Sequence, residues 1–235
     1  MQNTDLSIII PCYNEEKNIP LILRRFKSLL KRMKNVELIL VNNGSTDNSA
    51  KVLRKVIPNY KFARTVLIRV NKGYGFGILS GLLTARGKYL CWTHADMQTD
   101  PGDPIKAYYI IKNERSPEKV FVKGKRIGRP ISDLVLTYAM SIFESILFGR
   151  ILYDINAQPN LFHKSFMKIA KNPPKDFSLD LYFYYIAMKH NYKMRRFDVY
   201  FKKRIHGKSH WNTSIINKIK TIKRAISYSL NLRFG

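Results

Sequence analysis

The sequence predicts an α/β fold: a mostly parallel sheet flanked by helices, followed by a basic amphipathic C-terminal helix. The first observation behind this prediction is that strand-like apolar runs alternate with helical periodicity from Leu6 to Thr93. This alternation favours right-handed crossovers between parallel strands. The second observation is size, because 235 residues, 45% of them apolar, can bury one large core.

The first half of the chain divides into successive strands and helices. Asn18 before Pro20 marks a helix start, and apolar residues then recur at helical spacing as far as Met33. Short apolar runs predict strands at 6–10, 36–41, 66–70 and 89–93. Helical spacing predicts helices at 18–33, 50–57 and 77–85.

The second half is more basic and less regular. The predicted elements are a strand over 119–126 that enters a loop, an amphipathic helix over 132–152, a helix over 178–190 and a strand in which Phe197, Val199 and Phe201 alternate. The apolar face of the 132–152 helix is consistent with the core and also with a membrane contact.

The C-terminal segment 213–235 is predicted to be a basic amphipathic helix that follows a folded domain of residues 1–212. Apolar and basic residues share this segment: Ile215, Ile216, Ile219, Ile222, Ile226 and Leu230 at helical spacing, and Lys218, Lys220, Lys223 and Arg224 among them. The pattern suits a helix lying on anionic lipid, and packing of its apolar stripe on the domain is the alternative.

Charge and cysteine content describe the setting. Lys and Arg number 42 against 16 Asp and Glu, and the net charge of +26 attracts nucleic acid, anionic lipid or a phosphorylated substrate. Cys12 and Cys91 end apolar runs, so we interpret them as buried apolar residues of a protein in the reducing cytoplasm. No signal-peptide pattern or apolar stretch of spanning length occurs, so neither secretion nor membrane spanning is expected.

Polar clusters follow three of the predicted strands, at residues 11–15, 42–47 and 94–98. Ligands of parallel sheets bind outside the carboxyl ends of the strands, so these clusters are expected to meet at one crevice. Asp96 and Gln98 lie two residues apart after the fourth strand, and both can turn toward one hard cation. A cation held in this way keeps positions open for a diphosphate, as in a nucleotide-sugar site.

Six motifs in this order resemble family 2 glycosyltransferases of the Rossmann-like GT-A fold, most of all dolichol-phosphate mannose synthases and bacterial polyprenyl-phosphate glycosyltransferases. The motifs are IPCYNE (10–15), VNNGSTD (41–47), NKGYG (71–75), HADMQ (94–98), GKR (124–126) and RIHGKS (204–209). The resemblance extends from about Leu6 to Trp211.

The resemblance implies roles for individual residues. The nucleotide-sugar would be bound by Pro11, Tyr13, Glu15, Asn43, Gly44, Lys72, Gly73 and Asp96. The metal, Mg²⁺ or Mn²⁺, would be held by Asp96 and Gln98, with His94 beside them. The donor or acceptor phosphates would lie near Arg126, Gln158, Arg204, Lys208, Ser209 and His210. Asp96, Arg126 and Asp180 are the candidate catalytic residues.

The chain departs from the family pattern in two places. Asn42 and Asn43 stand where the family has an acidic pair, and an amide can donate as well as accept hydrogen bonds. His94 stands where the family most often has the first aspartate of its metal motif. A neutral imidazole can still bind Mn²⁺ but suits Mg²⁺ poorly.

The function these residues predict is inverting transfer of a sugar from a GDP- or UDP-sugar to a polyprenyl or dolichyl phosphate, the inversion being implied by the resemblance. Such an acceptor arrives ionised and needs a basic cradle, whereas a sugar hydroxyl would need a general base, for which Asp180 is the candidate. We expect peripheral attachment to the anionic cytoplasmic face of a membrane.

Three alternatives remain open. One is transfer to a sugar hydroxyl in the assembly of a surface glycan. The second is a catalytically inactive scaffold, suggested by His94 and by the Asn42–Asn43 pair. The third is a basic nucleic-acid-binding protein, against which stand the absence of any reader motif and the acidic and amide residues gathered at the strand ends, so no nucleic-acid partner is expected.

Overall fold

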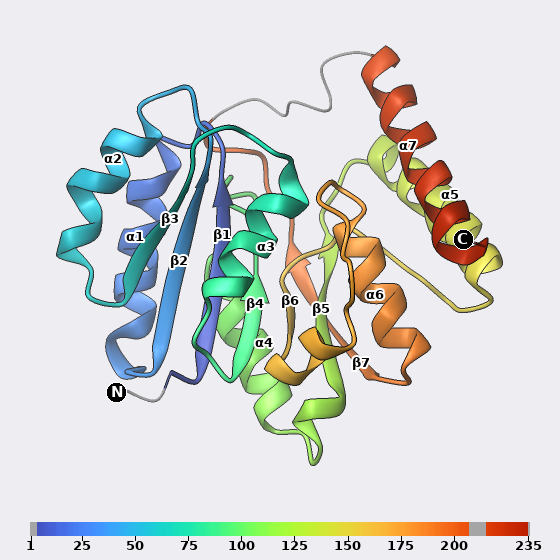
Figure 1. The fold of residues 1–235 in the computed structure, drawn as a ribbon, viewed down its shortest axis with the longest axis horizontal. Coiled ribbons are helices and arrows are strands. Elements are labelled where there is room, and N and C mark those ends of the chain that lie inside the picture. Colours follow the sequence, from blue (N-terminus) through green and yellow to red (C-terminus); the bar gives the residue numbers. More distant parts are fainter. Residues whose placement is uncertain (1–3, 207–214, 235) are drawn as a thin grey trace.

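The computed structural model describes residues 4–206 and 215–234. Its strands are β1 (Leu6–Cys12), β2 (Val36–Asn43), β3 (Ala63–Ile68), β4 (Tyr89–Trp92), β5 (Val120–Ile127), β6 (Asn160–His163) and β7 (Lys193–Tyr200). They form one seven-stranded sheet in the order β3-β2-β1-β4-β6-β5-β7, with helices on both faces (Figure 1). The predicted fold class is confirmed.

The direction of the strands decides where a site can form. Every neighbouring pair is parallel except the two that β6 makes, with β4 and with β5. The other six strands therefore point the same way, and their carboxyl ends share one edge of the sheet. The loops after these strands meet at that edge.

The helices are α1 (Asn18–Leu29), α2 (Ser49–Val56), α3 (Tyr74–Thr84), α4 (Asp103–Lys112), α5 (Ile131–Phe148), α6 (Leu179–Lys189) and α7 (Ile215–Phe234). Short 3₁₀ turns lie at Leu30–Arg32, Ile57–Asn59, Pro117–Lys119 and Lys164–Lys168.

Each face of the sheet has its own apolar core. Helices α1, α2 and α4 cover one face, where Phe26 and Tyr108 pack with Cys12 and Cys91. Helices α3 and α6 cover the other face, where Trp92 is a central residue. Both cysteines are buried and free, as predicted, and burial raises the pKa of each thiol.

The structure differs from the predicted elements in ways that have physical causes. The helix α4 was not predicted; it begins at Asp103 with Pro104 in its first turn, and its apolar pattern is weak. Strand β6 was not predicted either, because its four residues are too few to show an alternating apolar pattern. Helix α3 begins at Tyr74, three residues before the predicted start. Its first turn contains Gly75, because this turn lies close to other backbone. A Cβ on Gly75 would lie 2.7 Å from three backbone atoms of residues 174–176.

Helices α5 and α7 lie side by side at one side of the molecule, next to α6 (Figure 1). The Ser229 hydroxyl of α7 donates to Glu144 Oε1 of α5 at 2.6 Å. The predicted boundary between residues 212 and 213 lies outside the described residues. Within residues 4–206 and 215–234, we find no helix with both the length and the apolar character needed to cross a bilayer.

Candidate active site

The predicted site residues that the structure describes gather at the carboxyl edge of the sheet. The chain order runs outward from β1 through β2 to β3 on one side, whereas β4 lies on the other side of β1. The carboxyl ends of β1 and β4 therefore flank a topological switch point, where α/β sheets bind their ligands. The loops 13–15 and 93–98 begin there.

The loop after β1 is tied to the loop after β2. Asn14 has a left-handed backbone, with φ of 59°, and its Oδ1 accepts hydrogen bonds from Thr46 N at 2.8 Å and Asp47 N at 3.3 Å. The backbone N–H of Glu15 donates to Ser49 Oγ at 2.9 Å. These contacts hold the predicted nucleotide-binding residues Pro11, Tyr13 and Glu15 beside the second polar cluster.

Glu15 is an acidic group within electrostatic range of Asp96. Burial raises the pKa of Glu15 to about 7, the Asn18 side chain that donates to it at 2.5 Å opposes this shift, and the charge of Asp96 adds to it. The carboxyl groups that follow β1 and β4 are therefore close enough to repel each other. A cation between the two loops would relieve that repulsion.

Asn42 and Asn43 have different structural roles. Asn42 Oδ1 accepts from Ser45 N at 3.1 Å and closes the turn. Asn43 Nδ2 donates to Gly73 O at 2.9 Å and to Asn71 Oδ1 at 3.3 Å. Asn43 Oδ1 is buried and accepts no hydrogen bond from any described residue. Asn43 therefore offers an acceptor oxygen, as the expected aspartate would, without its charge.

Gly44 and Gly73 allow two loops to meet closely beside Asn43. Both have positive φ, 68° and 102°. A Cβ on Gly44 would lie 2.2 Å from Asn71 N, and a Cβ on Gly73 would lie 2.7 Å from Lys175 O. Lys72 between these contacts is exposed, with its Nζ 5.2 Å from the ring centroid of Phe76.

Asp96 and Gln98, the predicted metal ligands, share one cationic partner. Arg204 Nη2 lies 2.9 Å from Asp96 Oδ2, and Arg204 Nε donates to Gln98 Oε1 at 3.1 Å. Gln98 N donates to Asp96 Oδ1 at 3.1 Å, and Gln98 Nε2 donates to Lys202 O at 3.0 Å. The two side-chain oxygens thus converge on the same positive charge.

These oxygens fit a divalent cation that takes its remaining ligands from a diphosphate, as Mg²⁺ and Mn²⁺ commonly do. The guanidinium of Arg204 contacts both oxygens. No cluster of three or more His, Cys, Asp or Glu side chains suited to a metal occurs among residues 4–206 and 215–234. Asp96 and Gln98, with His94 beside them, stay the predicted metal ligands.

His94 lies at the centre of the site. Burial lowers the pKa of its imidazole, Asp96 and Asp180 oppose that shift, and Arg126 and Arg204 add to it. The ring is thus within electrostatic range of both predicted phosphate-binding arginines and of two carboxylates. It forms no hydrogen bond to any residue that the structure describes, and its neutral form keeps a lone pair for a ligand.

Asp180, the candidate base, is buried in a polar network below this edge. Its Oδ2 accepts from the Tyr74 hydroxyl at 2.9 Å. Its Oδ1 accepts from Trp92 Nε1 at 3.2 Å and from Asn160 Nδ2 at 2.7 Å. Gln158 joins the network through its Nε2, which donates to the Tyr74 hydroxyl, while its buried Oε1 accepts nothing from the described residues.

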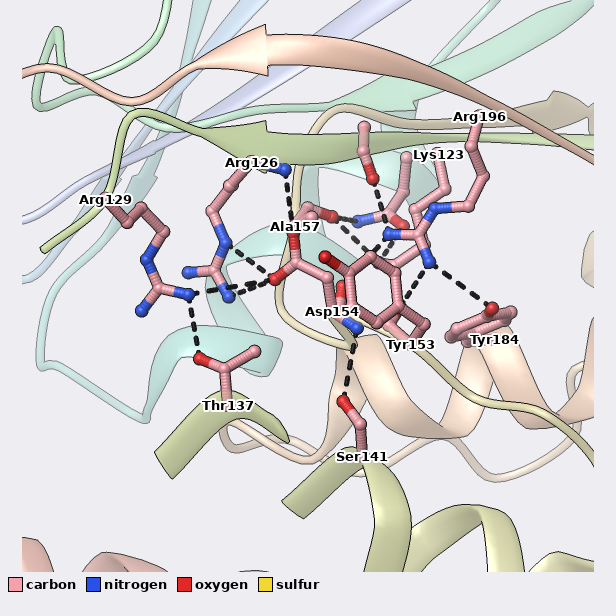
Figure 2. A network of polar contacts seen from close by, with 12 residues as sticks. Lys123, Arg126, Arg129, Thr137, Ser141, Tyr153, Asp154, Ala157, Tyr184 and Arg196 are labelled. Atoms are coloured by element: carbon pink, nitrogen blue, oxygen red, sulfur yellow. Dashed lines mark hydrogen bonds and ion pairs between the residues drawn. The ribbon is translucent and has the colours of Figure 1, made fainter. Parts of the chain in front are cut away.

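A cluster of basic side chains surrounds Asp154 beside this network; we call Lys123, Arg126, Arg129 and Arg196 the cation cluster (Figure 2). Arg126 donates to Asp154 three times: from its backbone N at 2.7 Å, from Nε at 2.8 Å and from Nη2. Arg129 Nη1 lies 4.0 Å from the same carboxylate. Burial alone would raise the pKa of Asp154, but Arg126 outweighs it and the pKa is lowered.

Two members of the cation cluster bind the backbone that carries Asp154. Arg196 Nη2 donates to Gly124 O at 2.7 Å and to Asp154 O at 3.3 Å. Lys123 Nζ donates to Ala157 O at 2.8 Å and to Asn160 Oδ1 at 2.7 Å. Burial lowers the pKa of Lys123 to about 7, which Asp180 partly opposes. Of these four basic groups, Arg126 and Arg129 thus face the Asp154 carboxylate, and Arg196 and Lys123 bind carbonyl oxygens beside it.

The structure brings together residues that the sequence predicted and residues that it did not. Arg126, Arg204 and Gln158 lie at the predicted edge. Lys208, Ser209 and His210 lie outside the described residues. The sequence did not single out Lys123, Arg129, Arg196, Tyr74 or Asn160 as site residues. A signal existed for Lys123, because it stands within an apolar strand, where a lysine needs buried partners.

Comparisons with known proteins identify the family and the fold of this chain. The model of the family described as "Glycosyl transferase family 2" matches residues 7–158, more than half of the chain. The dodecaprenyl-phosphate galacturonate synthase of Rhizobium johnstonii is 29% identical over 178 residues, which cover 73% of this chain and 51% of that protein. The dolichyl-phosphate beta-glucosyltransferase of Dictyostelium discoideum is 28% identical over 179 residues, 69% of this chain and 55% of that protein.

A third relative matches a shorter part of the chain at higher sequence identity. The undecaprenyl-phosphate 4-deoxy-4-formamido-L-arabinose transferase of Proteus mirabilis is 38% identical over 99 residues, 41% of this chain and 30% of that protein. The chain therefore spans about half or less of the length of these three curated relatives.

Among solved structures, glucosyl-3-phosphoglycerate synthase from Mycobacterium tuberculosis, in complex with Mn²⁺, UDP and glucosyl-3-phosphoglycerate, superposes with a TM-score of 0.72. The match covers 98% of this chain and 80% of that one at 14% identity, which shows the fold alone.

The fold is that of a glycosyltransferase domain of the GT-A class. The chain belongs to glycosyl transferase family 2.

Proposed function

We propose that this protein transfers one sugar from a nucleotide-sugar to a polyprenyl phosphate, with inversion at the anomeric carbon. The observation that carries the proposal is the cation cluster, in which Arg126 and Arg129 face the Asp154 carboxylate while Arg196 and Lys123 bind the backbone around it. One carboxylate leaves this group with a net positive charge. An acceptor that brings its own anionic phosphate needs such a site.

The donor side is formed by the loops after β1, β2 and β4. The free Oδ1 of Asn43 accepts a hydrogen bond from an N–H of the nucleobase. Asp96 and Gln98 hold the cation against the diphosphate. A bound divalent cation stabilises the negative charge that develops on the leaving nucleoside diphosphate. Arg204, once released from Asp96, adds a second positive charge to that leaving group.

The acceptor side is formed by the cation cluster. A phosphate monoester has a second pKa of roughly 6 and is largely ionised at neutral pH, so its oxygen attacks without a general base. Arg126 is held by Asp154 with its guanidinium fixed in one orientation. Such a preorganised fork suits two phosphate oxygens.

Transfer to a sugar hydroxyl would need a base, and Asp180 suits that role poorly. Its oxygens already accept hydrogen bonds from Tyr74, Trp92 and Asn160. We infer that Asp180 is a positioning residue that fixes these three side chains below the site.

The names of the relatives support a lipid-phosphate acceptor, because three of them contain dodecaprenyl, dolichyl or undecaprenyl phosphate. A polyprenyl phosphate lies in a membrane, and the net charge of +26 attracts this chain to an anionic surface. The proposal therefore includes peripheral attachment at the cytoplasmic face.

The test is release of nucleoside diphosphate from a panel of GDP- and UDP-sugars, with Mn²⁺ or Mg²⁺. Polyprenyl phosphate in vesicles is compared with soluble sugars as the acceptor. We expect release that requires both lipid and metal, falls about 100-fold or more in Asp96→Asn, and falls comparably in Arg126→Ala. Arg25→Ala, which removes an arginine paired with Asp100 outside the site, is the matched control. Release that needs only a soluble sugar and stops in Asp180→Asn would reject the proposal.

A further inference from the structure

Large apolar side chains are exposed along α5 from Ile131 to Ile146. Five of its side chains form what we call the α5 ridge, with exposed fractions of 79%, 64%, 46%, 61% and 78% for Ile131, Val135, Tyr138, Ile142 and Ile146. Their spacing of three or four residues places them on one side of the helix. At 1.5 Å per residue, the α5 ridge is about 22 Å long.

From residue 134 onward, the polar side chains of α5 face inward. The Thr137 hydroxyl accepts from Arg129 Nη1 at 2.7 Å, and Ser141 Oγ accepts from Asp154 N at 3.3 Å. Glu144 is buried against Ser229. Helix α5 therefore turns its polar side toward the cation cluster and its apolar side outward. This reverses the usual arrangement of a surface helix in water.

An outward apolar face of this size requires an apolar partner. The neighbouring helix α7 carries exposed basic residues, Lys220, Lys223 and Arg224. An apolar helix beside a basic helix matches the cross-section of an anionic bilayer, where acyl chains lie beneath charged headgroups. A second copy of the chain fits less well, because two molecules with a charge of +26 repel each other.

We propose that α5 is the element that enters the acyl region of an anionic membrane, and that α7 supports it and contacts the headgroups. The inference deepens the proposed function and rests on it for one point only, the orientation of the site. Through Thr137 and Ser141, the inserted helix would hold the cation cluster at headgroup depth, where a lipid phosphate lies.

The first test is flotation of the full chain with phosphatidylcholine vesicles that contain phosphatidylglycerol, without donor or polyprenyl phosphate. Transfer activity is not measured, so failure of the proposed function would leave this result intact. We expect Ile142→Ser/Ile146→Ser to bind these vesicles about tenfold or more weakly than the wild type. Leu67→Ser/Leu83→Ser is the matched control, because these leucines of β3 and α3 are 68% and 79% exposed. Equal binding by the wild type and the α5 variant would overturn the inference.

The second test measures depth and does not depend on the stability of the serine variant. Cys12 and Cys91 are fully buried, so a cysteine introduced by Ile142→Cys can be labelled selectively with an environment-sensitive fluorophore. We expect a blue shift on anionic vesicles, and none for the same label at Leu83→Cys. A label at position 142 that stays in water on vesicle-bound protein would contradict insertion.

Sedimentation of the wild type and of the serine variant tests the alternative occupant. A wild-type dimer that the serine variant loses, while the variant still binds vesicles, would assign the α5 ridge to a second copy instead.

Discussion

At the residue scale, the single guanidinium of Arg204 contacts both side chains that are predicted to hold the cation. Its contacts to Asp96 and Gln98 are 2.9 Å and 3.1 Å. Arg204 therefore supplies a positive charge at the two predicted ligands. A cation held by Asp96 would compete with this contact and would leave the arginine free to bind the diphosphate.

Replacing Arg204 should strengthen metal binding when no donor is present. We expect the Kd for Mn²⁺ of Arg204→Ala, measured by electron paramagnetic resonance of free Mn²⁺, to fall about two- to fivefold, since a partly exposed ion pair contributes up to about 1 kcal/mol. With a nucleotide-sugar present the benefit should vanish, because Arg204 then stabilises the donor phosphates.

The control for this experiment is Arg25→Ala, which removes another arginine from an ion pair with an aspartate, Asp100. It lowers the net charge by the same amount but leaves Asp96 untouched. If Arg204→Ala and Arg25→Ala bound Mn²⁺ equally well, Arg204 would not compete with the cation.

The residues that could be predicted from the sequence are those in motifs at strand ends. Asp96, Gln98 and Arg126 belong to short polar runs that follow apolar strands. Arg196 and Arg129 could not be recognised in this way. An arginine in a strand or before a proline looks like a surface residue until the chain that it contacts is known, here the 153–157 segment.

At the element scale, α5 shows why helical periodicity is an incomplete guide. The amphipathic pattern of 132–152 correctly predicts a helix, and the helix is observed at Ile131–Phe148. The pattern does not say which face points outward. That orientation depends on Thr137, Ser141 and Glu144, whose partners Arg129, Asp154 and Ser229 lie outside the helix.

Glu144 should make the α5–α7 contact sensitive to pH. Burial raises its pKa to about 7, against the opposing hydrogen bond from Ser229, and its Oε2 has no partner among the described residues. Between pH 4.5 and 7 the folded protein keeps a proton that the unfolded chain has lost, so Glu144 makes the free energy of unfolding fall as pH rises through this window.

The variant Glu144→Gln removes this dependence. We expect it to resemble the wild type near pH 4.5 and to be more stable above pH 7, by up to about 3 kcal/mol in the free energy of unfolding. Urea unfolding at several pH values measures this difference. Glu118→Gln, at an exposed glutamate, is the control. A Glu144→Gln benefit that is constant from pH 4.5 to 8 would contradict the raised pKa.

At the scale of the whole molecule, the fold gathers loops that are far apart in sequence. Six parallel strands deliver the segments after residues 12, 43, 68, 92, 127 and 200 to one edge. The alternation of strands and helices predicts the first four of these from sequence. The places of β5 and β7 depend on the antiparallel strand β6, which is only four residues long and leaves no periodic signal.

We infer that one sugar passes from a nucleotide to the phosphate of a polyprenyl lipid. Mass spectrometry of the lipid product, together with the identity of the released nucleotide, tests this inference. We expect a lipid heavier by one sugar residue on its single phosphate, and a nucleoside diphosphate as the other product. Release of a nucleoside monophosphate with a lipid diphosphate-sugar, or a sugar attached only to a soluble hydroxyl acceptor, would contradict it.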